Sequence, residues 1–412
     1  MVPSAPNCVH VADAVKRILD ARKNRLDSDR MRLPWFGKSR RAGRKISSAV
    51  GYHSEVIADV EVPESAESVR FFSRRIVKPG KLRRFSNRDF RESLLLAFYL
   101  GVAATLPVNW WAPICGWVSR LRRKRHISKD FSRYAPSTRA VLGDGVDAPK
   151  LFSAMLAGLH RRRLLFAAHL VGFSWSPSIR LEGLEGLHEA LKRGRGAIIW
   201  CDQFTTQTII GKRALHEAGV EAHQVSVRFH GISDTIFGLR FLNPPMVRVE
   251  NRFLKSRVVF DRSDAYQVTM RMQKILKENG VVLMTNNIHA GSTFAEVGLG
   301  ENGWTHLASA PANFAARGGA ALFAMSTFET VPFRQYRAVI SPELLPTAAG
   351  PEPVAKGGKN IELQAHYILL KRDRLLEALK LHPEQMMVWS GQDRLSERPD
   401  NAAPDDDAGM SS

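Results

Sequence analysis

The spacing of apolar and polar residues divides the chain into two parts, and the second part alternates between strand-like and helix-like segments. Beyond Pro177, short apolar runs typical of buried strands are separated by longer amphipathic stretches. The runs are AIIWC at Ala197–Cys201, VSVRF at Val225–Phe229, VVLM at Val281–Met284 and ALFAM at Ala321–Met325. Alternation of this kind predicts an α/β sheet covered by helices.

The helices expected in this second part have recognisable ends. The segment DRSDAYQVTMRMQKILKENG closes at Gly280, and SAPANFAARGG precedes the ALFAM strand. Glycine just beyond the last helical residue is a common helix stop. After Pro342 we expect a Pro/Gly-rich loop and a last helix that ends near Leu381. The α/β domain is therefore expected to span residues 177–392, and residues 393–412 to form a disordered polar tail.

The first part has a different character. Residues 1–85 carry scattered charges without a sustained period and predict a basic, largely flexible extension, with one short helix around residues 11–22. Residues 86–176 are expected to be helical, because LFSAMLAGLHRRRLLFAAHL repeats its apolar residues at helical spacing. Within this region, the segment from Ser93 to Ser119 contains no Asp, Glu, Lys, Arg or His.

The uncharged segment has features of a membrane interface. Pro107 and Pro113 interrupt it, and its second half contains Trp110, Trp111 and Trp117. Tryptophan favours the headgroup level of a bilayer, and a full crossing needs about 20 apolar residues. The alternatives are a proline-kinked span, a monotopic or re-entrant anchor, and a buried core helix beside a solvated basic segment.

The distribution of net charge indicates what the first part of the chain binds. The chain has 60 Lys and Arg against 40 Asp and Glu, a net charge of +20, and residues 1–163 account for +19 of it. Such a segment attracts nucleic acid or an anionic bilayer. No helix-turn-helix or aromatic RNA-binding pattern accompanies the basic residues, so we expect no nucleic-acid partner. Basic residues on both sides of an apolar segment mark the cytoplasmic, anionic leaflet of a membrane, so we expect an anchor near residues 93–119 on that face.

Cysteine and histidine usage bounds the chemistry. Three cysteines without a C-x-x-C pair exclude a disulfide-stapled fold and a cysteine zinc site of that kind. The 13 histidines include neither H-x-x-H nor H-E-x-x-H, so we expect no metal site. The sequence implies no metal or redox cofactor.

Ligand sites of α/β sheets gather where strands end. The first such turn, from Asp202 to Thr208, follows AIIWC. This turn and several other segments follow one another in an order that resembles the late acyltransferases of lipid A biosynthesis (lauroyl/myristoyl type), within the glycerolipid acyltransferase superfamily. The segments are Gly194–Ile199, Val227-Arg228, Phe260-Asp261-Arg262, the strand after Gly280, the Asn/His loop after it, Gly303–Gly319 and His382-Pro383-Glu384-Gln385.

The resemblance covers about residues 90–394 and implies a fold and an activity. The fold is a mixed sheet flanked by helices, with an N-terminal membrane-associated helical segment. The activity is transfer of a fatty acyl chain from an acyl thioester, on acyl carrier protein or coenzyme A, to a lipid or glycolipid hydroxyl. The implied partners are a membrane lipid or glycolipid and acyl carrier protein.

The catalytic signature of that family is a histidine, four residues, then a carboxylate. Imidazole removes the proton of the attacking hydroxyl, and the carboxylate orients the ring and stabilises the imidazolium. In this chain the histidine position falls on Gln203 and the carboxylate position on Thr208. Neither an amide nor a threonine can do this chemistry.

Three interpretations follow from this departure. The chain can be an acyltransferase whose general base lies at another position. Asp202, beside the end of the strand, is the nearest candidate, and His289, His216 and His230 are further candidates. The chain can instead be a catalytically inactive homologue that binds acyl chains or acyl carrier protein. Thirdly, Cys201 can accept the acyl group as a nucleophile, although a cysteine that ends a buried strand is usually a packing residue.

Substrate-binding residues are expected at two strand ends. Arg228 matches an arginine of the family pattern and is suited to a phosphate or carrier contact. Asn286 and Asn287 follow the VVLM strand, where relatives have an aspartate, and are expected to line the substrate cleft.

Overall fold

The protein is described from a computed structural model. The described residues are 44–45, 56–62, 68–78, 82–126, 131–172, 175–227, 230–260, 265–286, 291, 293–345 and 361–387. By its internal contacts the chain divides into Met1–Ala42 and Gly43–Ser412, and all described residues belong to the second unit. The expected short helix around residues 11–22 and the expected polar tail lie outside them.

A mixed seven-stranded sheet forms the centre of the α/β part. Its order is β4-β12-β11-β5-β8-β6-β7, and β11, β5, β8, β6 and β7 run parallel. Strand β12 is antiparallel to β11 and parallel to β4. The strands are β4 (Ser178–Glu182), β5 (Ala197–Cys201), β6 (Ala222–Val227), β7 (Ser256–Phe260), β8 (Val281–Thr285), β11 (Ala321–Val331) and β12 (Gln335–Ile340).

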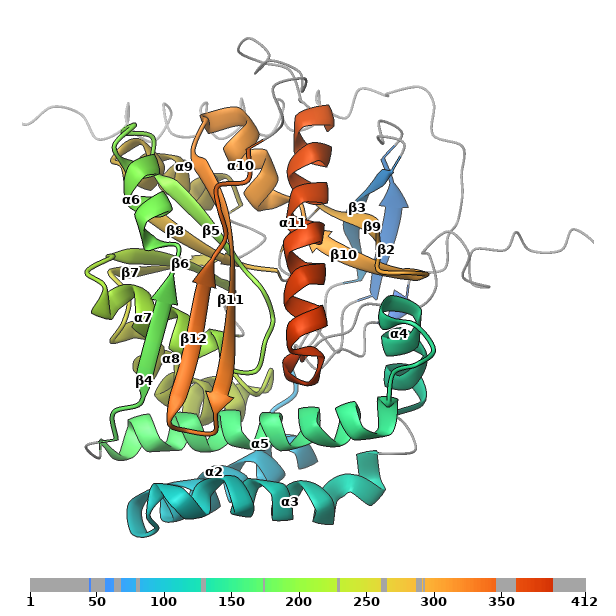
Figure 1. Ribbon diagram of the computed structural model, residues 1–412, viewed down its shortest axis with the longest axis vertical. Coiled ribbons are helices and arrows are strands. Elements are labelled where there is room, and N and C mark those ends of the chain that lie inside the picture. Colours follow the sequence, from blue (N-terminus) through green and yellow to red (C-terminus); the bar gives the residue numbers. More distant parts are fainter. Residues whose placement is uncertain are drawn as a thin grey trace, which may run out of the picture. The chain divides into compact units, whose positions relative to one another are not determined.

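Helices cover both faces of this sheet (Figure 1). Side chains alternate along β5, so that Ile199 packs with α6 (Leu184–Leu191) and α7 (Lys212–Glu217). Trp200 points the other way, into the core that includes α9 (Ala265–Lys277), α10 (Ala310–Gly318) and α11 (Ile361–Leu381). Because β5 is buried on both faces, its sequence is continuously apolar.

A second, antiparallel sheet packs against the other side of α11. It has five strands in the order β1-β2-β3-β9-β10, and α11 contacts β3, β9 and β11. The strands are β1 (Arg44–Lys45), β2 (Val56–Glu61), β3 (Val69–Lys78), β9 (Thr293–Leu299) and β10 (Gly303–Ala308). The expectation of a largely flexible extension over residues 1–85 is therefore wrong for β2 and β3. Strand β3 pairs on one side with β2 and on the other with β9, which lies in the last third of the chain, and this second pairing cannot be read from local sequence.

The expected helical region forms a layer at one end of the seven-stranded sheet. Helices α2 (Asn87–Thr105) and α3 (Trp111–His126) both pack on α5 (Ala148–Val171), as Figure 1 shows. Helices α4 (Ser132–Leu142) and α8 (Asn243–Asn251) and the short turn η6 (Pro383–Gln385) also contact α5. The other short turns are η1 (Val108–Trp110), η3 (Gln207–Gly211) and η4 (Gly238–Leu242).

The uncharged segment is thus split between two helices. Leu106 and Pro107 end α2, and the chain turns through η1 into α3. Among the described helices, none combines the length and the apolar character that a membrane crossing requires.

The α/β prediction is confirmed, with a mixed sheet flanked by helices. Three of the predicted apolar runs lie wholly in strands β5, β8 and β11 of the seven-stranded sheet. The fourth overlaps β6 over Val225–Val227, and its last two residues lie outside the described residues. Helices α9, α10 and α11 match the three predicted in the second part of the chain.

Candidate functional site

The candidate site lies at the carboxyl edge of the seven-stranded sheet. Strands β5, β8 and β6 are neighbours and parallel, so the residues that follow them share one edge. These residues are Asp202 and Gln203 after β5, Asn286 after β8 and His230 after β6. The structure brings two of the predicted site residues, Gln203 and Asn286, into direct contact.

Asp202 occupies an internal ion pair. Its carboxylate accepts hydrogen bonds from Lys371 Nζ at 2.6 Å and from Ser326 Oγ at 2.7 Å. The side chains of Asp202 and Lys371 are 1% and 0% exposed. A carboxylate that is enclosed and occupied in this way cannot reach a substrate hydroxyl, which argues against its predicted role as the replacement base.

Gln203 and Asn286 use their polar groups to hold the edge together. The Gln203 side-chain amide donates to the Asn286 carbonyl at 2.6 Å, and the Gln203 backbone carbonyl accepts from Met387 N at 3.0 Å. The Asn286 side-chain amide donates to His306 O at 3.3 Å, and Asn286 Oδ1 accepts from Ala308 N at 2.9 Å. Asn286 therefore links β8 to β10 of the second sheet.

Thr208 is half-buried in η3, the turn that leads into α7. Neither Gln203 nor Thr208 has a group that can take up a proton near neutral pH. The three other predicted positions, Arg228, Asn287 and His289, lie outside the described residues.

Cys201 is unsuited to the nucleophile role. Burial raises the pKa of its thiol to about 12, and the pKa of the Cys115 thiol is raised to about 12 for the same reason. A thiolate, not a thiol, is the attacking species, so Cys201 is a packing residue at the end of β5. His216 is exposed on α7, where its ring packs edge-on against Phe253 at 5.9 Å.

His230 is the candidate base that has a carboxylate partner. Its Nε2 lies 2.8 and 3.0 Å from the two carboxylate oxygens of Glu250, at the end of α8. Glu250 also accepts from Lys212 Nζ at 2.6 Å and from Arg257 at 2.8 Å. The Glu250 side chain is 1% exposed, whereas that of His230 is 29% exposed.

Burial alone would raise the pKa of Glu250, but its cationic neighbours Lys212, His230 and Arg257 outweigh that cost. The pKa is held well below its usual value, so Glu250 is ionised at neutral pH. Burial lowers the pKa of Lys212, which Glu250 partly opposes. The sequence alone did not identify Glu250, because η4 and most of α8 separate it from His230.

The three consecutive arginines of α5 have different roles. Arg161 pairs with Glu329, and Arg163 donates to Glu92 at 3.0 Å. Arg162 instead donates to Met387 Sδ at 3.0 Å, and among the described residues no carboxylate pairs with it. Burial lowers the pKa of Arg162 to about 10, with Glu250 acting in the opposite direction. Arg162 therefore lies near the Gln203 turn, because Met387 bonds to both, and it has no carboxylate partner among the described residues.

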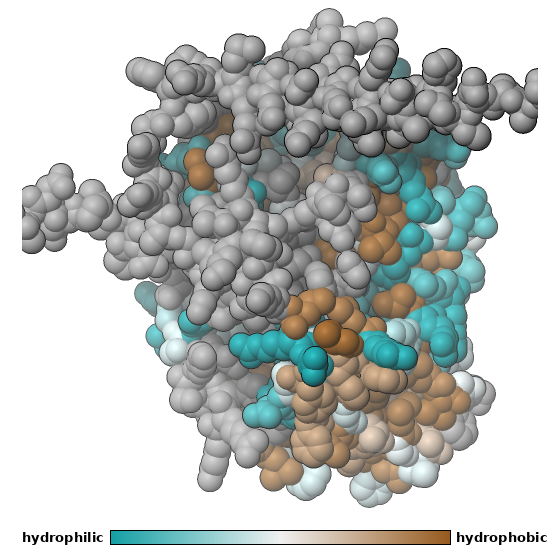
Figure 2. Space-filling model, turned by 180° about the vertical axis from the view of Figure 1, so that it is seen from behind, coloured by the Kyte–Doolittle hydropathy of each residue, from teal (hydrophilic) through white to brown (hydrophobic). Residues whose placement is uncertain are grey.

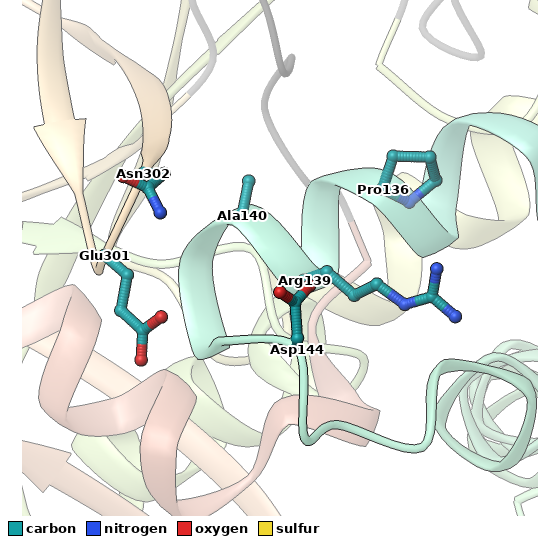
Figure 3. A pocket seen from close by; sticks show the side chains of 6 residues that line it. All are labelled: Pro136, Arg139, Ala140, Asp144, Glu301 and Asn302. Carbon is teal, nitrogen blue, oxygen red and sulfur yellow. The ribbon is translucent and has the colours of Figure 1, made fainter.

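A pocket elsewhere on the molecule does not involve this edge. It has a volume of about 280 Å³ and lies where the β9–β10 turn approaches α4 (Figure 3). Figure 3 shows the Arg139 guanidinium directed away from Glu301. The pocket is lined by Pro136, Arg139, Ala140, Asp144, Glu301 and Asn302.

In the part of the chain that the structure describes, no three His, Cys, Asp or Glu side chains converge as metal ligands would. The sequence matches no protein-family model, and no curated protein shows significant similarity to it.

Proposed function

We propose that this protein is a membrane-surface acyltransferase. It would move a fatty acyl chain from a thioester, on acyl carrier protein or coenzyme A, to the hydroxyl of a lipid or glycolipid of the lipid A type. It would act on the cytoplasmic face of the inner membrane. One observation carries the proposal: the loop that bears His230 at the sheet edge continues within a few residues into an exposed apolar surface.

This apolar surface combines α2, α3 and the loop after β6. Figure 2 shows hydrophobic residues over the lower end of the molecule, where α2 and α3 lie in Figure 1. The exposed large apolar residues of the surface are Phe85, Phe90, Leu94, Phe98, Leu106, Trp110, Trp117, Leu121, Ile236 and Phe241. We call these residues the apolar surface. Exposed apolar patches of this kind mark membrane or partner contacts.

The loop and the start of α2 are joined by specific bonds. Ser86 and Asp89 form a capping box at the first turn of α2. The Asp89 carboxylate also accepts from Ser233 and, at 2.9 Å, from Thr235. Phe237 contacts both Phe85 and Phe241, with ring centroids 5.1 Å apart in each pair. The sheet edge and the apolar surface are therefore parts of one packed unit.

Charge favours a bilayer as the occupant of this surface. The helices α2 and α3 are uncharged from Ser93 to Ser119, and basic residues stand on either side, including Arg88, Arg91 and Arg120. An uncharged, tryptophan-containing face with a basic border is typical of interfacial helices on anionic lipid. In this arrangement α2 and α3 lie in the membrane plane.

Arg162 supports an anionic substrate. Its guanidinium lies near Glu250, whose carboxylate is already shared by Lys212, Arg257 and His230. The cluster therefore has an excess of positive charge. A phosphate of the acceptor lipid or of the acyl donor would balance it.

A second candidate function is an inactive homologue that binds acyl chains or acyl carrier protein. The residues at the family positions favour it, since Gln203 and Thr208 have no acid–base group and Asp202 is committed to Lys371. Both functions predict the same membrane contact and differ in turnover.

Two measurements test the proposal. Lipid mass spectrometry of cells with and without the gene should reveal an acyl difference in a membrane lipid, and identical lipid profiles would favour the inactive homologue. Vesicle cosedimentation tests the surface: on phosphatidylglycerol vesicles, Trp110→Glu/Trp117→Glu should bind at least about tenfold more weakly than wild type. The control is Tyr266→Glu on α9, which removes an aromatic residue that is even more exposed than Trp110 and Trp117 and lies outside the apolar surface. Equal loss in both variants would contradict the assignment.

A further inference from the structure

We propose that His230, oriented by Glu250, is the general base of the acyl transfer. The pair would replace the histidine and carboxylate that are missing at Gln203 and Thr208. This inference rests on the proposed function and names the residues that perform it.

The contact with Glu250 fixes which ring nitrogen can act. An ionised carboxylate only accepts hydrogen bonds, so the short contacts to Glu250 require the proton on His230 Nε2. The other nitrogen, Nδ1, then carries a lone pair. With 29% of the side chain exposed, the ring is accessible from outside the protein. This is the relation between imidazole and carboxylate that general-base catalysis uses.

Glu250 is itself held in place from two further directions. Lys212 from α7 and Arg257 from β7 both donate to Glu250 Oε2, at 2.6 and 2.8 Å. Their charges keep Glu250 ionised in a buried site, and its position is fixed by three elements of the fold. A base presented by such a supported carboxylate is preorganised rather than mobile.

The backbone after His230 is equally constrained. Gly231 has a φ of +140°, and a Cβ at this position would lie 2.3 Å from Asn243 Cγ. Asn243 Oδ1 accepts from Ile232 N and Ser233 N at 3.0 and 3.1 Å, which closes the turn. Ser233 in turn donates to Asp89 of α2. The turn that places His230 is thereby tied to the helix that carries the apolar surface.

Other histidine–carboxylate pairs among the described residues fit the role less well. The side chains of His306 and Glu296 are only 9% and 0% exposed, so a substrate cannot reach them. His382 Nδ1 lies 3.6 Å from Glu384, beyond hydrogen-bond distance. His230 is the one that lies at the carboxyl edge beside β8 and has a short carboxylate contact.

The proposed step balances as follows. The acceptor hydroxyl oxygen attacks the thioester carbonyl carbon while His230 Nδ1 takes the hydroxyl proton. The tetrahedral intermediate collapses, the carbon–sulfur bond breaks, and the thiolate receives the proton from the imidazolium. The products are an ester and a free thiol, and His230 returns to its neutral form.

Thiol release measures this step. The full chain would be incubated with phosphatidylglycerol vesicles and either palmitoyl-coenzyme A or palmitoyl-acyl carrier protein. We expect His230→Gln to lower kcat by about 10²-fold or more with little change in KM, because loss of a general base costs roughly 10²–10⁴ in rate. The matched control is His223→Gln. His223 lies in β6, the strand that leads to His230, and the His223 ring hydrogen-bonds to Ser256 away from the carboxyl edge. It should keep the wild-type rate.

Chemical rescue separates catalysis from folding. Imidazole added to His230→Ala should restore part of the lost rate, whereas a purely structural histidine would not be rescued in this way. Wild-type rates in His230→Gln, or no rescue of His230→Ala, would overturn the role of His230 and leave the proposed function standing. No thiol release by wild type with either donor would contradict the proposed function, and the base with it.

Discussion

Removal of the Asp202 carboxylate should destabilise the protein strongly, because it would leave Lys371 without a counter-charge in the core. The two side chains are 1% and 0% exposed, with 2.6 Å between the carboxylate oxygen and Nζ. Loss of one partner of a buried ion pair typically costs about 3–5 kcal/mol. For a domain of this size, 1 kcal/mol shifts Tm by about 2–4 °C. We therefore expect Asp202→Ala to lower Tm by about 6–20 °C.

A thermal melt followed by circular dichroism measures this effect. Lys371→Met should lower Tm by a similar amount, and the double variant Asp202→Ala/Lys371→Met should be more stable than the sum of the single effects implies. The control is Glu189→Ala, which removes an ion pair with Lys192 of the same 2.6 Å length. The side chains of Glu189 and Lys192 are both 73% exposed, so we expect no measurable change in Tm.

The reasoning would be refuted by an Asp202→Ala variant that melts within about 3 °C of wild type. If that stable variant also failed to transfer acyl groups, Asp202 would be a catalytic residue and not an internal counter-ion. A large loss of stability is expected only for a buried counter-ion. The exposed Glu189–Lys192 pair shows what loss of an ion pair costs without burial.

Three further predictions follow from single residues. Burial lowers the pKa of His169 to about 4 from 6.5. The unfolded chain therefore takes up this proton first, and stability should fall by about 3 kcal/mol as pH drops from 6.5 to about 4. Urea unfolding across that range should show a smaller fall in His169→Leu, and an unchanged slope would contradict the assignment. Gly231→Ala should lose most thiol-release activity and lower Tm, since its Cβ would overlap Asn243; a fully active variant would show that the turn adapts. In Cys8→Ser, iodoacetamide should label Cys115 and Cys201 only after denaturation, because both thiols are buried. Rapid labelling of the native protein would reopen the nucleophile role of Cys201.

The sequence predicted the elements whose signal is local. Strand β5 is a continuous apolar run, and α9 ends at a glycine, so both are visible within a short stretch of the chain. Strands β3 and β9 each pair with a neighbour in the sequence, β2 and β10, but the pairing of β3 with β9 joins distant parts of the chain and has no local signal. The division of the uncharged segment into α2 and α3 follows from Pro107, which ends the first helix. A proline predicts the interruption, but it does not predict where the second helix packs.

The site illustrates the same limit. Gln203 and Asn286 follow neighbouring parallel strands and are in contact, because parallel strands bring their carboxyl ends to one edge. The catalytic and substrate-binding roles of these positions stay predictions. The sequence could not show that Asp202 is buried, since its partner Lys371 belongs to α11, near the other end of the α/β domain. Nor could it pair His230 with Glu250, because η4 and most of α8 separate them in the sequence. The residue type of His230 suggests a base, but only the folded structure shows that Glu250 is its carboxylate partner.

One reaction tests the proposed acyl transfer most directly. Purified protein, palmitoyl-acyl carrier protein and vesicles of total membrane lipid would be incubated together, and the lipids analysed by mass spectrometry. The account predicts a lipid ester that carries the palmitoyl chain, at a rate that falls about 10²-fold in His230→Gln and not in His223→Gln. Absence of any acylated lipid with wild type, together with retained binding of the acyl carrier protein, would identify an inactive homologue and contradict the account.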